Sequence, residues 1–115
     1  EFVVEDIAAV RETVGDTTLK VIIESPALSE TEIQRAAALV EEAGADFVKT
    51  AVGYDGPTDP ADIEAIRRGV GPEMGVKASG GIGSFEEAMA MVRAGATRIG
   101  ASSGVAIYES APSPT

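Results

Sequence analysis

The chain has 115 residues, 44% of them hydrophobic, which suffices for one domain with its own core. Nine basic against nineteen acidic residues give a formal net charge of −10, so we expect neither nucleic acid nor an anionic membrane as a partner. Because the chain contains no Cys and no His, it lacks the commonest general base and the commonest metal ligands, and we expect no metal and no cofactor.

Helical and strand-like segments alternate along the whole chain. In chain order we expect a helix over 2–14, a strand over 19–24, a helix over 29–44, a strand over 46–52, a helix over 59–71, a strand over 75–79, a helix over 84–95, a strand over 98–102 and a short helix over 104–110. We assign 1–110 to a single domain and 111–115 to a flexible tail.

Capping residues mark where the helices begin and end. Ser29 with Glu32, and Ser84 with Glu87, have the spacing of a capping box. Asp59 is a candidate N-cap, because a proline follows it at the first helical position. The glycines expected to end helices are Gly15, Gly44 and Gly95.

The alternation predicts a parallel sheet with right-handed crossovers. The repeats also resemble one another, since "EAGADFVKT" at 42–50 is similar to "RAGATRIGA" at 93–101. Two architectures fit: an open, doubly wound sheet, or part of a (β/α)₈ barrel. A complete barrel takes roughly 250 residues, so four units are about half of one. The length alone would suit the open sheet equally well.

Two lysines, Lys49 and Lys77, lie near the carboxyl ends of predicted strands. A single lysine in a strand is usually exposed to solvent. Strands of a parallel sheet, however, are covered and tend to be apolar, and in a barrel the inward side chains at the carboxyl rim line the active site. Two ammonium groups in one cavity lower each other's pKa, and a neutral amine can attack a carbonyl carbon. The pair therefore indicates Schiff-base chemistry.

Two glycine-flanked loops follow the last two strands, "SGGIGS" at 79–84 and "IGASSG" at 99–104. Each could be a simple turn into a helix. Side by side they would present backbone N–H groups and hydroxyls to an anion. In barrels the phosphate site commonly follows strands seven and eight, so these loops indicate a phosphate site if the four strands are the last four. Arg98 starts its strand and is a poor phosphate ligand.

The segments "LKVIIES", "AGADFVKTAVG" and "GVKASGGIGSFEEAMAMVRAGATRIGASSG" resemble the deoxyribose-phosphate aldolase family. They cover most of residues 19–104 in the family's order and spacing. The resemblance implies an α/β fold of parallel βα repeats, here the C-terminal half of a TIM (β/α)₈ barrel. It implies class I aldolase activity that cleaves 2-deoxyribose 5-phosphate into acetaldehyde and glyceraldehyde 3-phosphate.

The resemblance also implies roles for individual residues. Lys49 would form the Schiff base, and Lys77 would lower the pKa of its amine. Backbone and hydroxyl groups of the two loops would hold the substrate phosphate, and Gly100 would permit close approach. The implied phosphate-binding residues are Gly80, Gly81, Gly100, Ser102 and Ser103. We add Lys20 and Thr50 as candidates for the cavity lining.

The chain departs from the family's pattern at three points. Ala51 and Val52 stand where a serine and a threonine are usual, and Ala101 stands where a threonine is usual. Four strands that precede this segment in the family are absent, including one with an aspartate that assists proton transfer. We therefore expect weak or no turnover from the chain alone, together with self-association or pairing with the missing half.

Other functions remain open at this point. The chain could belong to another Schiff-base or phosphate-binding barrel, such as an archaeal class I fructose-bisphosphate aldolase or a thiazole synthase. It could also be a non-catalytic half-barrel that serves in assembly. The absence of a secretory signal and of an apolar run near ~20 residues leads us to expect a cytoplasmic protein. The acidic composition is also typical of adaptation to high salt.

Overall fold

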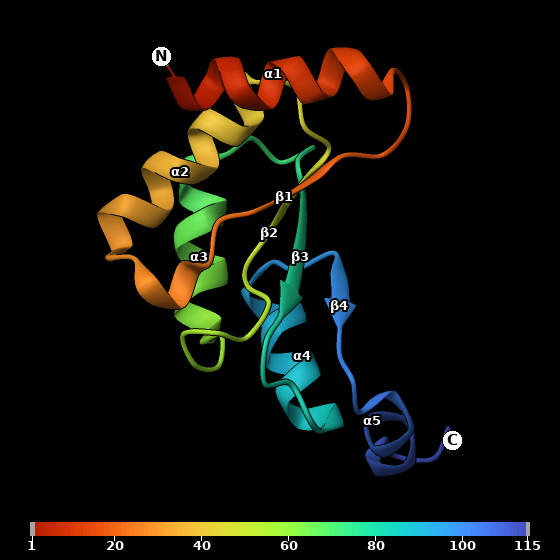
Figure 1. Ribbon diagram of the computed structural model, residues 1–115. Helices are drawn as coiled ribbons and strands as arrows, with labels where there is room; N and C mark the ends of the chain where they lie inside the picture. The colour runs from red at the N-terminus through yellow and green to blue at the C-terminus, as the bar shows by residue number, and fades with distance from the viewer. Residues whose placement is uncertain (1, 115) are drawn as a thin grey trace.

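A computed structural model describes residues 2–114 and shows four parallel strands that alternate with helices (Figure 1). The elements are α1 (Phe2–Val14), β1 (Lys20–Ile22), the 3₁₀ helix η1 (Ser25–Ala27), α2 (Glu30–Glu42), β2 (Phe47–Lys49), α3 (Pro60–Gly69), β3 (Gly75–Ser79), α4 (Phe85–Ala94), β4 (Arg98–Gly100) and α5 (Gly104–Ser110). Within this part of the chain, no helix has the length and apolar character needed to cross a membrane.

The strands lie in the sheet in the order of the chain, β1-β2-β3-β4. Because each crossover steps in the same direction with the same hand, helices α2, α3 and α4 all lie on one face, and the opposite face stays bare (Figure 1). A doubly wound sheet would have helices on both faces, so that alternative is wrong. The predicted half of a (β/α)₈ barrel is confirmed.

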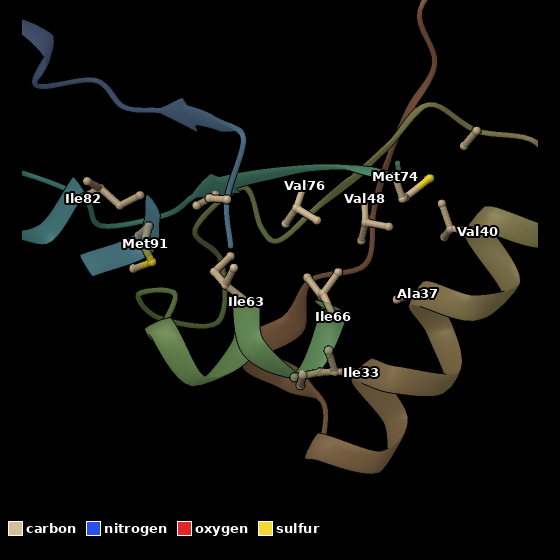
Figure 2. Close-up of a cluster of buried hydrophobic side chains, with 14 of the residues drawn as sticks. Ile33, Ala37, Val40, Val48, Ile63, Ile66, Met74, Val76, Ile82 and Met91 are labelled. Atoms are coloured by element: carbon tan, nitrogen blue, oxygen red, sulfur yellow. The ribbon is translucent and has the colours of Figure 1, made fainter. Parts of the chain in front are cut away.

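The hydrophobic core fills the space between the sheet and its helices. Ile63 and Ile66 of α3 point toward Val48 of β2 and Val76 of β3, and all four side chains are fully buried (Figure 2). Helix α2 adds to the same core on one side and Met91 of α4 on the other. The alternation within each strand turns the neighbouring residues, including both lysines, toward the bare face.

The predicted helix starts are formed as local hydrogen bonds. Ser29 Oγ accepts from the Glu32 N–H at 3.2 Å, and the Glu32 carboxylate accepts from the Ser29 N–H at 2.8 Å, so this capping box is complete. Asp59 caps α3 by accepting from the Ala61 N–H at 2.8 Å. At α4 only half of the predicted box forms, because the Glu87 carboxylate accepts from the Gly83 N–H instead.

Three strands are shorter than predicted. The predictions over 19–24, 46–52 and 98–102 each contain a strand of three residues, whereas 75–79 is reproduced in full. At the end of β1 the chain turns at Glu24, whose backbone is left-handed with φ 52°, and enters η1, which was not predicted. The predicted tail has neither helix nor strand over 111–114, while residues 1 and 115 lie outside the described part.

Candidate active site

A cavity of about 750 Å³ opens at the carboxyl end of the sheet. Its walls come from the ends of β2, β3 and β4 and from the loops that follow them. Chain segments far apart in the sequence meet here because the carboxyl ends of parallel strands share one edge. Seven of the nine predicted site residues line the cavity, namely Lys49, Lys77, Gly80, Gly81, Gly100, Ser102 and Ser103.

The two lysines are direct neighbours across the sheet. Lys49 of β2 and Lys77 of β3 are paired in register, on strands that run about 4.8 Å apart. The pKa of the Lys77 ammonium is lowered, mainly by desolvation and then by the positive charges of Lys49, Lys20 and Arg98. Among the described residues neither Lys49 nor Lys77 has an ion-pair partner. The Lys77 ammonium therefore loses its proton more readily than a lysine in water.

Gly100 makes room for the side chain of Lys77. A Cβ atom at this position would lie 2.8 Å from Lys77 Cε, so a larger residue would displace the end of the lysine side chain. The resemblance had assigned Gly100 to the approach of the phosphate. The structure gives this glycine a contact with the amine-bearing side chain as well, which connects the lysine pair to the loop of Ser102 and Ser103.

The loop after β3 requires glycine for two reasons. Gly80 and Gly81 both have positive φ, 109° and 78°, which L side chains rarely adopt. A Cβ at Gly81 would also lie 2.7 Å from the Cβ of Pro57. The backbone therefore passes close to the preceding loop and forms part of the cavity wall without a covering side chain.

Thr50 is not part of the cavity lining, contrary to expectation. It is fully buried, and its hydroxyl donates to the Ser79 carbonyl at 2.7 Å and accepts from the Ser79 N–H at 3.0 Å. The Thr58 hydroxyl lies 3.0 Å from it and donates to the same carbonyl at 2.6 Å. These buried hydroxyls therefore link Thr50, which follows Lys49, to Ser79, which precedes Gly80. Strand alternation explains why Thr50 is buried. It follows Lys49, which points toward the bare face, so Thr50 points to the opposite face of the sheet.

Lys20 does not line the cavity either. It lies on the bare face but at the first residue of β1, near the amino end, with its Nζ 5.9 Å from the centre of the Phe47 ring. The Arg98 guanidinium carbon lies 4.5 Å from the same ring. The three lysines of the chain and Arg98 thus share one sheet face, which is positive in an otherwise acidic protein, and two of them, Lys49 and Lys77, line the cavity.

Two residues that support the cavity wall were not assigned a role from the sequence. Glu24 Oε1 accepts from the Val52 N–H at 3.1 Å and so fixes the loop after β2, and Thr58 joins the buried hydroxyl group described above. Strand alternation places Glu24 on the same face as Lys20 but gives it no role, and no periodicity bears on Thr58. The proline and glycine around Thr58 indicate only a loop.

Known proteins of one family are similar in sequence to nearly the whole chain. The model of the DeoC/LacD family of aldolases matches residues 2–110. A protein named deoxyribose-phosphate aldolase from Streptococcus suis (strain 98HAH33) is 53% identical over 112 residues, which cover 96% of this chain and 51% of that protein. A relative of the same name from Macrococcus caseolyticus is 51% identical over 110 residues, 95% of this chain and 50% of that protein.

Solved structures are similar to this chain over almost its whole length and over about half of their own. The structure described as "QR15, an Aldolase" superposes with a TM-score of 0.87 at 42% identity, covering 94% of this chain and 49% of that chain. A deoxyribose phosphate aldolase from Aeropyrum pernix, described as tetrameric, gives a TM-score of 0.85 at 35% identity, covering 93% and 47%. The chain spans about half the length of the relatives it matches.

Proposed function

Because this chain belongs to the DeoC/LacD family of aldolases, we propose that it carries the amine and phosphate half of a class I aldolase that cleaves 2-deoxyribose 5-phosphate. The products would be acetaldehyde and glyceraldehyde 3-phosphate. The observation that carries the proposal is the pairing of Lys49 with Lys77 in a cavity whose other wall is the glycine loop of Gly80 and Gly81.

We propose that Lys49 is the nucleophile. As a neutral amine it adds to the aldehyde carbon of the open sugar, and loss of water leaves an imine. The protonated imine accepts the electron pair of the breaking carbon–carbon bond while the hydroxyl group on the departing carbon loses its proton to a base. This releases glyceraldehyde 3-phosphate and leaves the enamine of acetaldehyde. Protonation of the enamine and hydrolysis of the imine then return the free lysine. Lys77 lies beside this centre with a lowered pKa and is suited to exchange protons with it.

The loops after β3 and β4 would hold the phosphate. Backbone N–H groups next to Gly80 and Gly81 and the hydroxyls of Ser102 and Ser103 border the same cavity as the lysines. Binding energy from the phosphate would then position the reacting carbon at Lys49, since remote contacts can be used for orientation.

The bare face supports a further part of the proposal, that the chain works with a second half or a second copy. Strands β1 and β4 have unpaired edges, which invite pairing with other strands. The catalytic assembly would act in the cytoplasm on a phosphorylated sugar, in deoxyribonucleotide breakdown. Sedimentation of the isolated chain tests the association, and a well-folded monomer that binds no apolar dye would contradict it.

Borohydride trapping tests the chemistry. The chain is incubated with acetaldehyde and sodium borohydride, with and without a covering half, and the reduced adduct is mapped by mass spectrometry. We expect the adduct on Lys49 and its loss in Lys49→Met. Lys20 is an internal control, because it is the remaining lysine of the chain and lies outside the cavity. Equal labelling of all three lysines would contradict the proposal, and an adduct confined to Lys77 would exchange the two roles.

A further inference from the structure

Three cations occupy one row across the bare face of the sheet. Lys49 pairs in register with Lys77, and Lys77 pairs with Arg98 of β4. Their side chains share the face opposite the helices, because Val48, Val76 and Ile99 beside them in the strands pack into the core. Lys77 is therefore the central member of the row, with a positive charge on each neighbouring strand.

Arg98 is held in this row by an aromatic ring. Its guanidinium carbon lies 4.5 Å from the centre of the Phe47 ring, well within the range of a cation–π contact. Among the described residues it has no carboxylate partner. The ring thus replaces the acidic residue that usually accompanies an arginine, and it holds Arg98 without neutralising its charge.

Gly75 determines where the ring lies. A Cβ on this residue would come within 2.6 Å of two carbons of the Phe47 ring, so the ring lies directly against the bare backbone of β3. Phe47 and Gly75 are partners in register, two residues before Lys49 and Lys77 on the same strands. Lys20 approaches the ring from β1, with Nζ 5.9 Å from its centre.

We propose that Arg98 is a positioning residue: clamped on the Phe47 ring, it holds a permanent positive charge beside the Lys77 ammonium and so favours the neutral amine of Lys77. Arginine suits this role because it does not lose its proton at any pH at which a lysine titrates. This role of Arg98 in catalysis rests on the proposed function, since a neutral Lys77 can take up a proton during imine chemistry. We define the clamp as Phe47, Gly75 and Arg98.

The charged groups that act on Lys77 come from every neighbouring strand. In order of decreasing effect they are Lys49 on β2, Lys20 on β1 and Arg98 on β4, and all three are positive. Desolvation of Lys77 acts in the same direction as these charges. Removing Arg98 therefore leaves two repelling groups in place, so the effect of the substitution is partial.

The test is a titration of lysine side chains by NMR, in the 115-residue chain labelled with ¹³C at the lysine ε-carbon. Only three lysine signals arise, and Lys20→Arg and Lys49→Arg variants assign them. We expect Arg98→Met to raise the midpoint of Lys77, and Arg98→Lys to restore most of the wild-type value. Arg93→Met is the matched control, since Arg93 is exposed on α4, and it should leave the midpoint unchanged.

A double substitution tests the clamp itself. Phe47→Leu should also raise the midpoint of Lys77, and most of this rise should disappear in the Arg98→Met background. Any rise that remains there comes through Lys20, which contacts the same ring. Added salt should raise the wild-type midpoint more than that of Arg98→Met, because the ions screen one repulsion fewer in the variant. This comparison remains available if Phe47→Leu does not fold.

Two results would overturn the inference: an Arg98→Met midpoint equal to that of Arg93→Met, or a full effect of Phe47→Leu in the absence of Arg98. The titration requires no substrate and no covering half. Its outcome is therefore separate from that of the trapping experiment, and either proposal can fail without the other.

Discussion

At the amino end of the sheet two arginines donate to backbone carbonyls, whereas at the carboxyl end two lysines face a cavity without an ion-pair partner among the described residues. Arg11 binds the segments that lead into β1 and β2, through the carbonyls of Thr17 and Gly44 and through Asp46. Arg67 binds those that lead into β3 and β4, through the carbonyls of Met74 and Gly95.

The two ends thus use positive charge for opposite purposes. At the amino end each guanidinium satisfies backbone acceptors that would otherwise lack donors, which stabilises the strand starts. At the carboxyl end the lysine amines repel one another, and the loops need glycine conformations that other residues rarely adopt. Stabilising contacts are concentrated at one end and the proposed chemistry at the other, as expected for a barrel.

The largest effect that we expect on stability comes from Arg67→Leu at the amino end. The variant loses hydrogen bonds of 2.8 Å to the Met74 carbonyl and 2.9 Å to the Gly95 carbonyl. Charged donors of this kind stabilise by about 1.5–3 kcal/mol each, so we expect the free energy of unfolding to fall by about 3–6 kcal/mol in urea titrations. The neighbouring Arg68→Leu removes only exposed ion pairs with Glu30 and Glu64 and should cost less than about 1 kcal/mol. Equal losses would contradict the contrast between the two arginines.

The second prediction compares a glycine at each end. Gly81→Ala at the cavity and Gly15→Ala after α1 both force a side chain into positive φ, at a cost of about 1–2 kcal/mol. Only Gly81 also meets Pro57, so its loss of stability should be larger by about 1 kcal/mol or more. Gly81→Ala should weaken the binding of inorganic phosphate in an NMR titration, and Gly15→Ala should not. Equal phosphate affinity in the two variants would mean that the loop is only structural.

The third prediction is that Lys77→Met stabilises the fold at pH 7. Desolvation and the neighbouring cations hold the folded-state pKa of Lys77 below its ordinary value of 10.5, so the charged form costs stability at neutral pH. This cost is complete below the folded-state pKa and disappears as the pH rises toward 10.5. The difference between variant and wild type should therefore shrink between pH 7 and pH 10 in urea titrations. A variant less stable than wild type at pH 7 would show that packing of the lysine stem outweighs the repulsion.

The smallest effect should come from Asp46→Asn at the amino end. The Leu19 N–H, and then Arg11, hold the pKa of the Asp46 carboxyl below its ordinary value of 3.8. The carboxylate therefore adds stability above pH 3.8, and this contribution is lost as the pH falls through the lower, folded-state pKa. We expect Asp46→Asn to lower the melting temperature slightly at pH 7 and not at pH 2. The same decrease at both pH values would assign the effect to packing instead of charge.

Local patterns predicted the helices and their starts well because capping is a contact between residues three positions apart. Ser29, Asp59 and Ser84 each accept from a backbone N–H two or three residues later, and nothing distant is required. The strand ends were predicted less well. A β-branched run continues past Ile22, but Glu24 turns out of the sheet to enter η1. Whether a strand continues depends on its partner and not on its own residues.

The sequence by itself determined the order of βα units, the placement of two lysines near strand ends and the glycine loops beside them. These features follow from periodicity and from the rule that parallel strands end at one edge. Only the tertiary structure decided that Thr50 is buried against Ser79, that Lys20 lies outside the cavity, and that Phe47 rests on Gly75 with Arg98 above it. Each of these depends on the register between strands, and register is set by contacts between residues that the sequence keeps far apart.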